Sequence, residues 1–429
     1  MAIYGSMALA ALVRWPEVWL PGLLLAAAYV PFEIQTGTGT TLNIVVIGIA
    51  VLTVLWIAQM FLRREVRLAP AESNAPWIAL LLVAGFSILA GGALWNPWVF
   101  TKNNFIIVQL AQWSIFILSG GAFWLTANAV AGRQVLRRLT QIVLFFGVLL
   151  LLRSIPVVSL ASRFQLLDGP VFRIWVVALA SALALFEPAR PRWQRLALFA
   201  FAALFVLEMW RTGSSWQSGW LPPLVTVGVV MAVRLGRGLT RAAVISAVPG
   251  VLILVTVILP RLASSDDWSL GTRIVAWRGL VDLLRDRWLF GLGLASYWHY
   301  WRGIFGTMAY RDPRTGYMHI THDPTVNMHN NYMDILGQMG ILGTLVFVWL
   351  CVAIYRDARR QFTAEPPGFG RAYVAACVGG FAGMLCAAML ADWIFPFVYN
   401  IGLRGFRDSY LGWMLLGGLV LLRRTRPEA

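Results

Sequence analysis

Histidine and arginine, the residue types best suited to acid–base and phosphate chemistry, gather between residues 261 and 331 of the 429-residue chain. All four histidines lie there: His299, His319, His322 and His329. A near-neutral imidazole can accept or donate a proton, and an arginine guanidinium binds phosphate through paired hydrogen bonds. We therefore expect any chemistry that this protein performs to involve this segment.

His329 stands apart from the other histidines because a helix is expected to begin directly after it. Asn330 and Asn331 can cap a helix, and an apolar run suited to a membrane span begins at about Tyr332. A rigid helix would then hold the imidazole of His329 at the membrane surface. This placement suits a general base, or a group that orients a substrate hydroxyl. The alternative is a histidine that only caps the helix or makes a structural hydrogen bond.

A metal site is the second kind of chemistry that the segment suggests. His319, His322 and Asp323 lie close together in the sequence, and His329 comes shortly after them. Their spacing matches no established zinc pattern. We expect no metal and no other cofactor, and we keep a metal site as the less favoured alternative.

Four arginines lie at or near the ends of apolar runs, on the side of the membrane where the predicted topology places the histidines: Arg153, Arg173, Arg211 and Arg273. A charge in such a position is costly and usually has a function. Several cations at one membrane depth favour a cavity that binds an anionic group, because the guanidinium stays charged and pairs with phosphate. The alternative is that each arginine extends to the interface as an anchor.

The residues around Arg273 predict a short helix on the outer membrane surface. Thr272 can cap a helix that runs to about Trp288, with Trp277 on its apolar face. Arg273 lies one turn before Trp277 on the same face, which is unusual for a solvated cation. A belt of aromatic residues comes next, at Tyr297, Trp298, Tyr300 and Trp301. This belt predicts interfacial anchoring or, alternatively, stacking on sugar rings.

The composition places most of the remaining chain in a membrane. Hydrophobic residues make up 59% and charged residues 13% of the sequence, which excludes an ordinary soluble domain. Apolar stretches long enough to cross about 30 Å of hydrocarbon recur along the chain. We predict an all-α, polytopic membrane protein of about 12 transmembrane helices. The expected spans are near residues 18–32, 42–61, 76–94, 105–127, 139–158, 171–186, 196–210, 220–233, 242–260, 332–355, 372–393 and 410–422.

The net charge of +16 follows this predicted topology. With the amino terminus in the cytoplasm, the arginine-rich turns all fall inside, as the positive-inside rule requires. These turns are near residues 63–67, 133–138, 190–195, 234–241, 356–360 and 423–426. The charge therefore argues for membrane topology and against nucleic-acid binding. Residues 261–331 then form one large extracytoplasmic loop, with short helices, of a single transmembrane domain spanning residues 1–429.

The cysteines and the amino-terminal sequence give only weak signals. Cys351, Cys377 and Cys386 fall within predicted spans, so we expect small buried residues and no disulfide or metal site. No cleavable signal peptide is evident, and we expect the first span to target the chain to the membrane.

Two motifs that bracket this loop resemble those of the bacterial O-antigen ligase and polymerase superfamily. Residues 273–277, RIVAW, and residues 286–293, DRWLFGLG, are similar to the family's Arg-x-x-x-Trp stretch leading to Pro-x-x-Gly-x-Gly. Residues 329–343, HNNYMDILGQMGILG, are similar to its His-Asn-x-(Tyr/Phe)-Leu signature with Glu-x-Gly-x-x-Gly after it. The specific part of the resemblance covers about residues 211–345.

The sequence departs from the family pattern at three places. Trp288 stands where proline is usual, and Gln338 replaces the usual glutamate. The family's Ser-Arg pair has no counterpart in residues 214–220, around Gln217, and Arg211 is the candidate to supply that charge.

The resemblance implies a membrane glycosyltransferase. Such an enzyme transfers or polymerises a glycan from an undecaprenyl-pyrophosphate-linked donor onto an acceptor hydroxyl, with inversion at the anomeric carbon. The expected catalytic residues are His329 and Arg273. The expected substrate-binding residues are Arg211, Arg173, Asn330, Tyr332 and Trp277. The partners would be the lipid-linked donor, a glycan or lipid acceptor and membrane lipids, at the outer face of a bacterial inner membrane.

Two other functional classes remain open from the sequence. A polytopic transporter or flippase for a lipid-linked or anionic substrate would also have many spans, although we find no internal repeat of the kind that such proteins show. A non-catalytic membrane subunit of an envelope assembly system is the third interpretation. Within the enzyme class, the residues do not distinguish a ligase from a polymerase.

Overall fold

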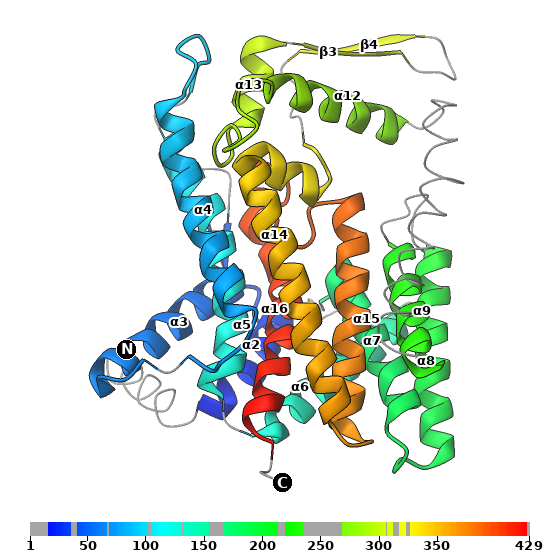
Figure 1. The fold of residues 1–429 in the computed structure, drawn as a ribbon. Helices are drawn as coiled ribbons and strands as arrows, with labels where there is room; N and C mark the ends of the chain where they lie inside the picture. Colours follow the sequence, from blue (N-terminus) through cyan, green and yellow to red (C-terminus); the bar gives the residue numbers. More distant parts are fainter. Residues whose placement is uncertain are drawn as a thin grey trace.

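The computed structural model shows a bundle of long helices capped at one end by shorter elements (Figure 1). The structure describes residues 16–35, 41–66, 68–101, 104–130, 132–153, 167–212, 219–235, 268–305, 307–311, 317–322 and 327–426.

The described elements are mostly helical. In chain order the helices are η1 (Pro16–Val18), α2 (Trp19–Tyr29), α3 (Ile44–Arg63), α4 (Asn74–Ala93), α5 (Phe105–Trp124) with its π-helical continuation η2 (Leu125–Ala129), α6 (Arg133–Arg153), α7 (Pro170–Phe186), α8 (Arg192–Thr212), α9 (Leu221–Leu235), α12 (Trp268–Leu283), α13 (Tyr297–Ile304), α14 (Asn331–Ala364), α15 (Phe369–Leu390) and α16 (Gly402–Arg424). Two antiparallel strand pairs join β1 (Glu33–Gln35) to β2 (Thr41–Asn43) and β3 (Thr307–Arg311) to β4 (Met318–His322).

Seven of the described helices are long and apolar enough to cross a membrane. They are α3, α4, α5 with η2, α6, α8, α14 and α15. The shorter helices α2, α7 and α9 are also apolar, with 11, 17 and 15 residues. The prediction of a helical membrane protein is therefore confirmed. The span expected at 242–260 lies outside the described residues, and the total of about twelve stays a prediction.

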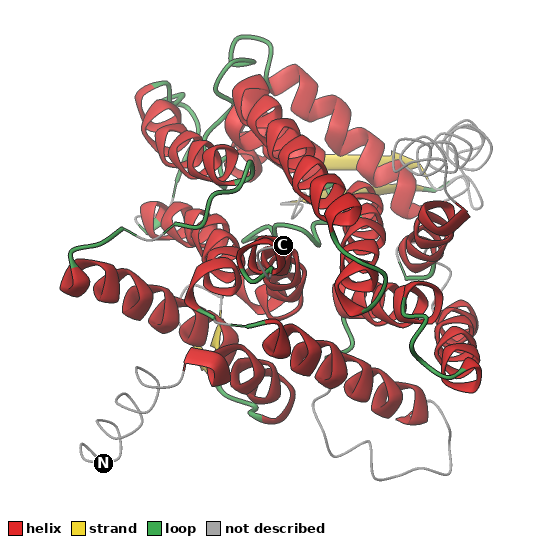
Figure 2. Ribbon diagram, turned by 60° about the horizontal axis from the view of Figure 1, so that its bottom comes forward, coloured by secondary structure: helices red, strands yellow, loops and turns green. Residues whose placement is uncertain are grey.

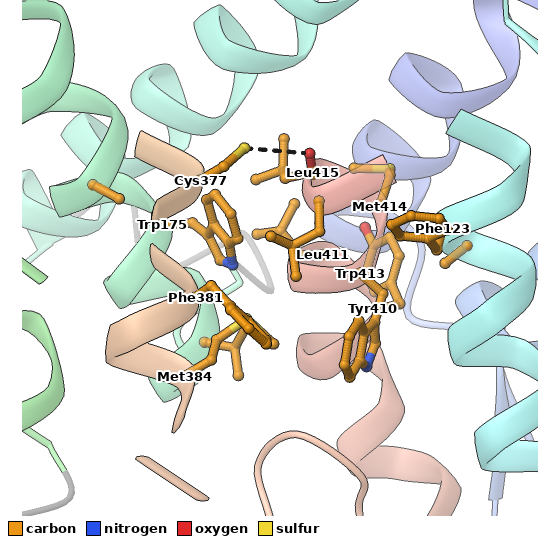
Figure 3. Packing of buried hydrophobic residues seen from close by; sticks show 14 of the residues in the cluster. Phe123, Trp175, Cys377, Phe381, Met384, Tyr410, Leu411, Trp413, Met414 and Leu415 are labelled. Atoms are coloured by element: carbon orange, nitrogen blue, oxygen red, sulfur yellow. Dashed lines mark hydrogen bonds between the residues drawn. The ribbon is translucent and has the colours of Figure 1, made fainter. Parts of the chain in front are cut away.

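The last helix, α16, lies in the middle of the bundle, where the carboxyl terminus is marked in Figure 2. Every residue from Tyr410 to Leu422 is buried. A helix that is apolar on all sides must be surrounded by others, and α16 packs against α5, α7, α14 and α15. Figure 3 shows part of this core, in which Trp175 of α7 and Cys377 of α15 face α16. The thiol of Cys377 lies 3.7 Å from the backbone oxygen of Leu415, and all three cysteines are free.

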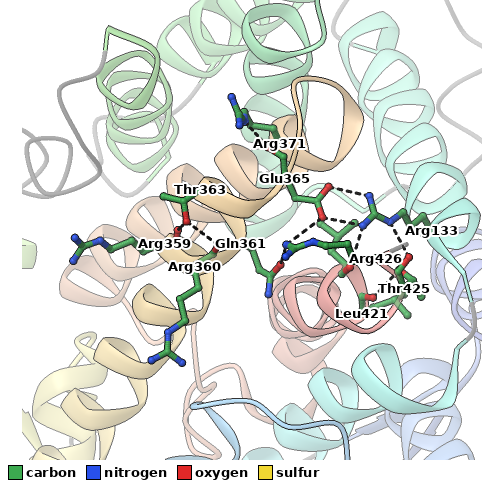
Figure 4. A network of polar contacts seen from close by, with 11 residues as sticks. Arg133, Arg359, Arg360, Gln361, Thr363, Glu365, Arg371, Leu421, Thr425 and Arg426 are labelled. Atoms are coloured by element: carbon green, nitrogen blue, oxygen red, sulfur yellow. Dashed lines mark hydrogen bonds and ion pairs between the residues drawn. The ribbon is translucent and has the colours of Figure 1, made fainter. Parts of the chain in front are cut away.

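Arginine-bearing turns meet at one end of the bundle (Figure 4). The guanidinium of Arg133 makes two hydrogen bonds of 2.9 Å to the carboxylate of Glu365. Arg426 lies 3.7 Å from the same carboxylate. These contacts bring together the start of α6, the α14–α15 connection and the end of α16. Two of the turns expected on the cytoplasmic side, near residues 133–138 and 423–426, therefore lie side by side.

The opposite end of the bundle carries α12, α13 and the β3–β4 pair (Figure 1). The sequence predicted one helix from Thr272 to about Trp288, whereas α12 runs from Trp268 to Leu283 and is followed by turns. After Leu283 the backbone makes turns, in which the amide of Arg287 donates to the oxygen of Leu284 at 2.8 Å. The turn that follows docks on α14, where the amide of Leu292 donates to the backbone oxygen of Gly337 at 2.8 Å.

A break in α14 receives this turn. Gly340 has φ +64° and ψ −162°, so the helix is interrupted there. The freed amide of Ile341 donates to the oxygen of Trp288 at 2.7 Å, and the amide of Gly293 donates to the oxygen of Gln338 at 3.1 Å. The break thus exchanges helical hydrogen bonds for bonds between two distant segments.

Candidate active site

His329 lies two residues before the start of α14 and has a left-handed backbone, with φ +46°. Asn330 caps the helix: its side-chain oxygen accepts from the amides of Tyr332 at 2.9 Å and Met333 at 3.2 Å. This cap agrees with the sequence prediction. Left-handed backbone is unusual for a residue other than glycine, and it persists where the surroundings fix it. The imidazole is therefore held by a defined backbone geometry and by a capped helix.

Asn331 ties the start of α14 to the chain that leaves α15. Its amide nitrogen donates to the oxygen of Phe395 at 2.7 Å, and its oxygen accepts from the amide of Ile394 at 2.9 Å. Asn331 is fully buried. A buried side-chain amide that uses both its donor and its acceptor fixes the relative position of the two segments.

The segment after α15 also brings two polar side chains to His329. The side-chain nitrogen of Asn400 lies 3.3 Å from Nδ1 of His329 and 2.7 Å from Oδ1 of Asp392. The other oxygen of Asp392 accepts from the amide of Phe397 at 2.8 Å. Asp392 is 1% exposed. Asn400 therefore links the imidazole to a buried carboxylate.

Arg273 reaches the same place from α12. Its guanidinium is buried and donates to the backbone oxygen of Leu390, at the end of α15, at 2.6 Å. Burial raises the pKa of Asp392, while its hydrogen bonds and the charge of Arg273 oppose this shift. The cation thus lies close enough to the carboxylate to stabilise its ionised form.

The imidazole of His329 is neutral in this environment. Burial, and then the positive charge of Arg273, lower its pKa to about 4. A neutral imidazole beside a fixed guanidinium combines a group that can exchange a proton with a group that binds an anion. His329 and Arg273, predicted as catalytic residues from motifs far apart in the sequence, therefore lie within electrostatic reach of each other.

Trp277 and Tyr332, expected to bind substrate, have partners within the protein. The indole of Trp277 donates to the backbone oxygen of Met328 at 2.9 Å, directly before His329. The hydroxyl of Tyr332 donates to the backbone oxygen of Leu385 at 2.8 Å. Trp277 thus holds the backbone directly before His329, and Tyr332 ties the start of α14 to α15. Their role in substrate binding stays a prediction.

The structure does not join Arg173 and Arg211 to His329 through any described contact. Arg173, near the start of α7, lies 3.4 Å from the carboxylate of Glu208 and donates to the backbone oxygen of Asp168 at 2.9 Å. Arg211 is exposed at the end of α8. Arg153 lies 4.0 Å from Asp168. Arg173 is thus already paired with a carboxylate, whereas Arg211 has no carboxylate partner among the described residues.

Of the remaining histidines, His299 has packed, structural surroundings. His299 is 4% exposed and its Nε2 lies 3.0 Å from the hydroxyl of Tyr399, with Phe105 packed against its ring. His319 and His322 belong to β4, and Asp323 lies outside the described residues. Among the described residues, no group of three or more His, Cys, Asp or Glu could hold a metal ion.

The aromatic belt on α13 packs largely against other rings. Tyr297 stacks on Phe397 with ring centres 4.7 Å apart, and Trp298 stacks on Tyr399 at 5.0 Å. The belt therefore docks α13 onto the segment that carries Asn400. This packing favours a structural role for these rings over stacking on sugars.

The comparisons with known proteins agree with the two motifs. Residues 195–348 match the O-antigen ligase family. This match confirms the predicted resemblance to the superfamily of O-antigen ligases and polymerases, and it includes both Arg273 and His329. No curated protein matches the chain.

The departures from the O-antigen ligase pattern have different structural settings. Trp288 lies in the turn that docks on α14, where its backbone oxygen accepts from the amide of Ile341 and its side chain packs against a buried cluster. Gln338 is 1% exposed, and its side-chain oxygen accepts from the amide of Ala295 at 3.2 Å. An amide oxygen accepts this bond as a carboxylate would, without a further buried charge. Residues 213–218 lie outside the described part of the chain.

Three site residues were missed by sequence reasoning. Asp392 lies at the end of the span expected at 372–393, Asn400 lies in the connection after it, and Asp334 lies inside the span expected at 332–355. Asp334 is 2% exposed, and its carboxylate accepts from the hydroxyl of Tyr297 at 2.9 Å. An acidic residue in or at the end of an apolar run is a signal of function that was available in the sequence.

Proposed function

We propose that this protein is a membrane glycosyltransferase of the O-antigen ligase or polymerase type. It transfers a glycan from an undecaprenyl-pyrophosphate-linked donor to an acceptor hydroxyl. The observation that carries the proposal is the pairing of a neutral imidazole, His329, with a buried guanidinium, Arg273, at one end of a membrane bundle. The family match supports the same reaction class.

Arg273 binds the pyrophosphate in this proposal. The bond from the anomeric carbon to the pyrophosphate oxygen breaks as negative charge builds on that oxygen, and a preorganised cation stabilises this charge. A guanidinium suits the task because it stays protonated and donates two parallel hydrogen bonds to phosphate oxygens. Arg211 supplies a second, more exposed cation, and Arg173 has the weaker claim because it is paired with Glu208.

His329 acts on the acceptor hydroxyl. The oxygen of this hydroxyl attacks the anomeric carbon from the face opposite the pyrophosphate. His329 either orients the hydroxyl or, as general base with its hydrogen on Nδ1, takes up the hydroxyl proton at Nε2. Nε2 is the nitrogen that remains for substrate, since Asn400 occupies Nδ1. Asn400 and Asp392 are positioning residues in this scheme, because they hold the ring.

The contact with Asn400 separates two roles for His329. A base needs the hydrogen on Nδ1, for which Asn400 would present its amide oxygen. A group that orients the hydroxyl by donating to it carries its hydrogen on Nε2, and its Nδ1 then accepts from the side-chain nitrogen of Asn400. The bond from the same nitrogen to Asp392 favours this tautomer. His329→Gln separates the roles, because glutamine can orient a hydroxyl and cannot take up its proton. We expect loss of transfer in this variant.

The proposed topology has about twelve spans with the arginine-rich end in the cytoplasm. Residues 261–331 then lie outside a bacterial inner membrane and carry Arg273, and the whole chain is one transmembrane domain. The arginine contacts around Glu365, at the end opposite His329, support this orientation. A donor that has been moved across the membrane would meet the site from the outer leaflet.

The decisive experiment measures glycan transfer by purified protein with a defined lipid-linked repeat unit. Wild type should form product, while His329→Ala and Arg273→Ala should form none and should keep the elution profile and melting behaviour of a folded protein. Near-normal transfer by either variant would remove that residue from the mechanism. Vesicles that move the lipid-linked unit across the bilayer without forming product would instead favour a transporter.

The same assay separates the two family activities. Incubation with the lipid-linked repeat unit alone should give chain growth for a polymerase. A ligase should stay inert until a different acceptor, such as a lipid core, is added.

A further inference from the structure

A cavity of about 500 Å³ opens between α6, α7 and α8, at the arginine-rich end of the bundle and away from His329. Its polar part contains the side chains of Arg137, Thr140, Gln141, Arg190 and Gln194. Its apolar part runs along α6 and α8 and is lined by Leu144, Phe145, Val148, Ala197, Leu198 and Phe201. A cavity with a polar end and an apolar groove matches an amphiphile better than a soluble anion.

The polar part carries an uncompensated positive charge. Arg190 is paired with Glu187, with 2.5 Å between Nε and the carboxylate. The guanidinium of Arg137 lies over the ring of Phe369, 4.9 Å from its centre, and has no carboxylate partner among the described residues. The two arginines and one glutamate therefore leave one net positive charge, which complements a singly charged phosphate diester.

A buried hydroxyl at the cavity wall lacks a hydrogen-bond partner. Thr140 borders the cavity, is 2% exposed, and its Oγ1 has no partner among the described residues. Buried polar groups are nearly always satisfied, so an orphan at a cavity wall points to a ligand oxygen. Thr140 lies one turn from Arg137 on α6, so one phosphate group can contact both side chains.

The length of the groove fits one leaflet. The rise along α6 from Arg137 to Val148 is about 16 Å. This is about half of a hydrocarbon core of about 30 Å. Phe145 and Val148 are 54% and 42% exposed, so the groove opens toward the surrounding lipid.

We propose that this cavity binds one phospholipid with an anionic headgroup. The phosphate contacts Arg137 and Thr140, and one acyl chain follows the apolar walls of α6 and α8. The site is independent of glycan transfer, because it lies at the other end of the bundle from Arg273 and His329. General attraction of basic turns to an anionic leaflet needs no cavity, whereas this site predicts retention of a single lipid by particular residues.

Native mass spectrometry of the detergent-purified protein tests the proposal. The probes are dioleoylphosphatidylglycerol and, as the uncharged comparison, dioleoylphosphatidylcholine. Wild type should retain one phosphatidylglycerol in preference to phosphatidylcholine. Arg137→Gln should reduce this retention about fivefold, the effect expected for one arginine near a lipid phosphate. Thr140→Val, which keeps the side-chain shape, should weaken it as well.

Arg138→Gln is the matched control, because Arg137 and Arg138 are both exposed neighbours on α6 and only Arg137 lines the cavity. It should retain the lipid as wild type does. Unchanged retention in Arg137→Gln, or an equal loss in Arg138→Gln, would overturn the proposal. Inorganic phosphate that binds wild type as tightly as the lipid would show a soluble-anion site and would also overturn it.

Discussion

Gly291 lies directly against Gly340, with no room for a side chain between them. A Cβ on Gly291 would lie 2.6 Å from the amide nitrogen of Gly340, and a Cβ on Gly340 would lie 2.5 Å from that of Gly291. Both residues have positive φ, +74° and +64°. One glycine belongs to the motif that follows Arg273 and the other to the motif that begins at His329. Their contact is what joins the two halves of the candidate site.

Gly340→Ala should therefore destabilise the protein by about 3 kcal/mol. Left-handed backbone costs a residue with a Cβ about 1–2 kcal/mol, and overpacking adds about 1–3 kcal/mol. Thermal unfolding of the purified protein measures the loss. Gly92→Ala is the control, since nothing lies within 4 Å of a Cβ there and alanine favours the helix. Equal melting temperatures for the two variants would contradict the packing argument.

The pH dependence of transfer should reflect the lowered pKa of His329. An ordinary histidine with a pKa of about 6.5 would lose its neutral form below that pH. Burial and Arg273 lower the pKa of His329 to about 4, so the neutral ring should persist between pH 5 and 7 and this group should cause no loss of rate there. The acid limb of the rate profile should fall near pH 4.

A direct titration of His329 tests whether burial and Arg273 lower its pKa. In Arg273→Gln the pKa should rise, because a repelling cation is removed, but it should stay below 6.5, because burial is the larger effect. Histidine-labelled protein followed by NMR gives this value without any need for activity. An unchanged pKa of His329 in the variant would contradict an electrostatic interaction between Arg273 and His329.

Much of the helical framework could be predicted from hydrophobic runs alone. The spans expected at 76–94 and 171–186 correspond to α4 (Asn74–Ala93) and α7 (Pro170–Phe186). The cap at Asn330 was also predictable, because it depends on local sequence. The central position of α16 was not, since it follows from contacts with several helices that no local pattern records.

The candidate site was predictable only where motifs marked it. Arg273 and His329 stood out because each lies in a recognisable sequence pattern. Asp392 and Asn400 did not, because Asn400 meets His329 across 71 residues of chain, through the packing of α14 against α15. The docking of residues 288–293 on α14 was hidden for the same reason, since it depends on bonds between distant segments such as that from Leu292 to Gly337.

Asp392→Asn should reduce kcat about tenfold to a hundredfold, with a smaller effect on KM. The variant keeps the shape but removes the charge that holds Asn400 and balances Arg273, so the imidazole loses its fixed position. Rates with the lipid-linked donor, compared at equal amounts of folded protein, measure the effect.

A buried carboxylate at the other end of the bundle provides the control for Asp392. Asp357 accepts from the hydroxyl of Ser73 at 2.8 Å and is 6% exposed. Asp357→Asn should lower the melting temperature and leave kcat unchanged. An equal loss of kcat in both variants would mean that Asp392 acts only through stability.

Arg211 and Arg173 should respond differently to the same substitution. Arg211 is exposed, so Arg211→Gln should change stability by no more than about 0.5 kcal/mol. If its guanidinium contacts the pyrophosphate, the KM for the donor should rise about tenfold, as expected for one charge-assisted hydrogen bond of about 1.5–3 kcal/mol.

Arg173→Gln should instead lower the melting temperature, because it removes the cation beside Glu208. Glu208→Gln in the same chain should recover part of that loss, since the partly buried carboxylate is then also neutral. A rise in the donor KM for Arg173→Gln with an unchanged melting temperature would instead assign donor binding to Arg173 and contradict its structural role.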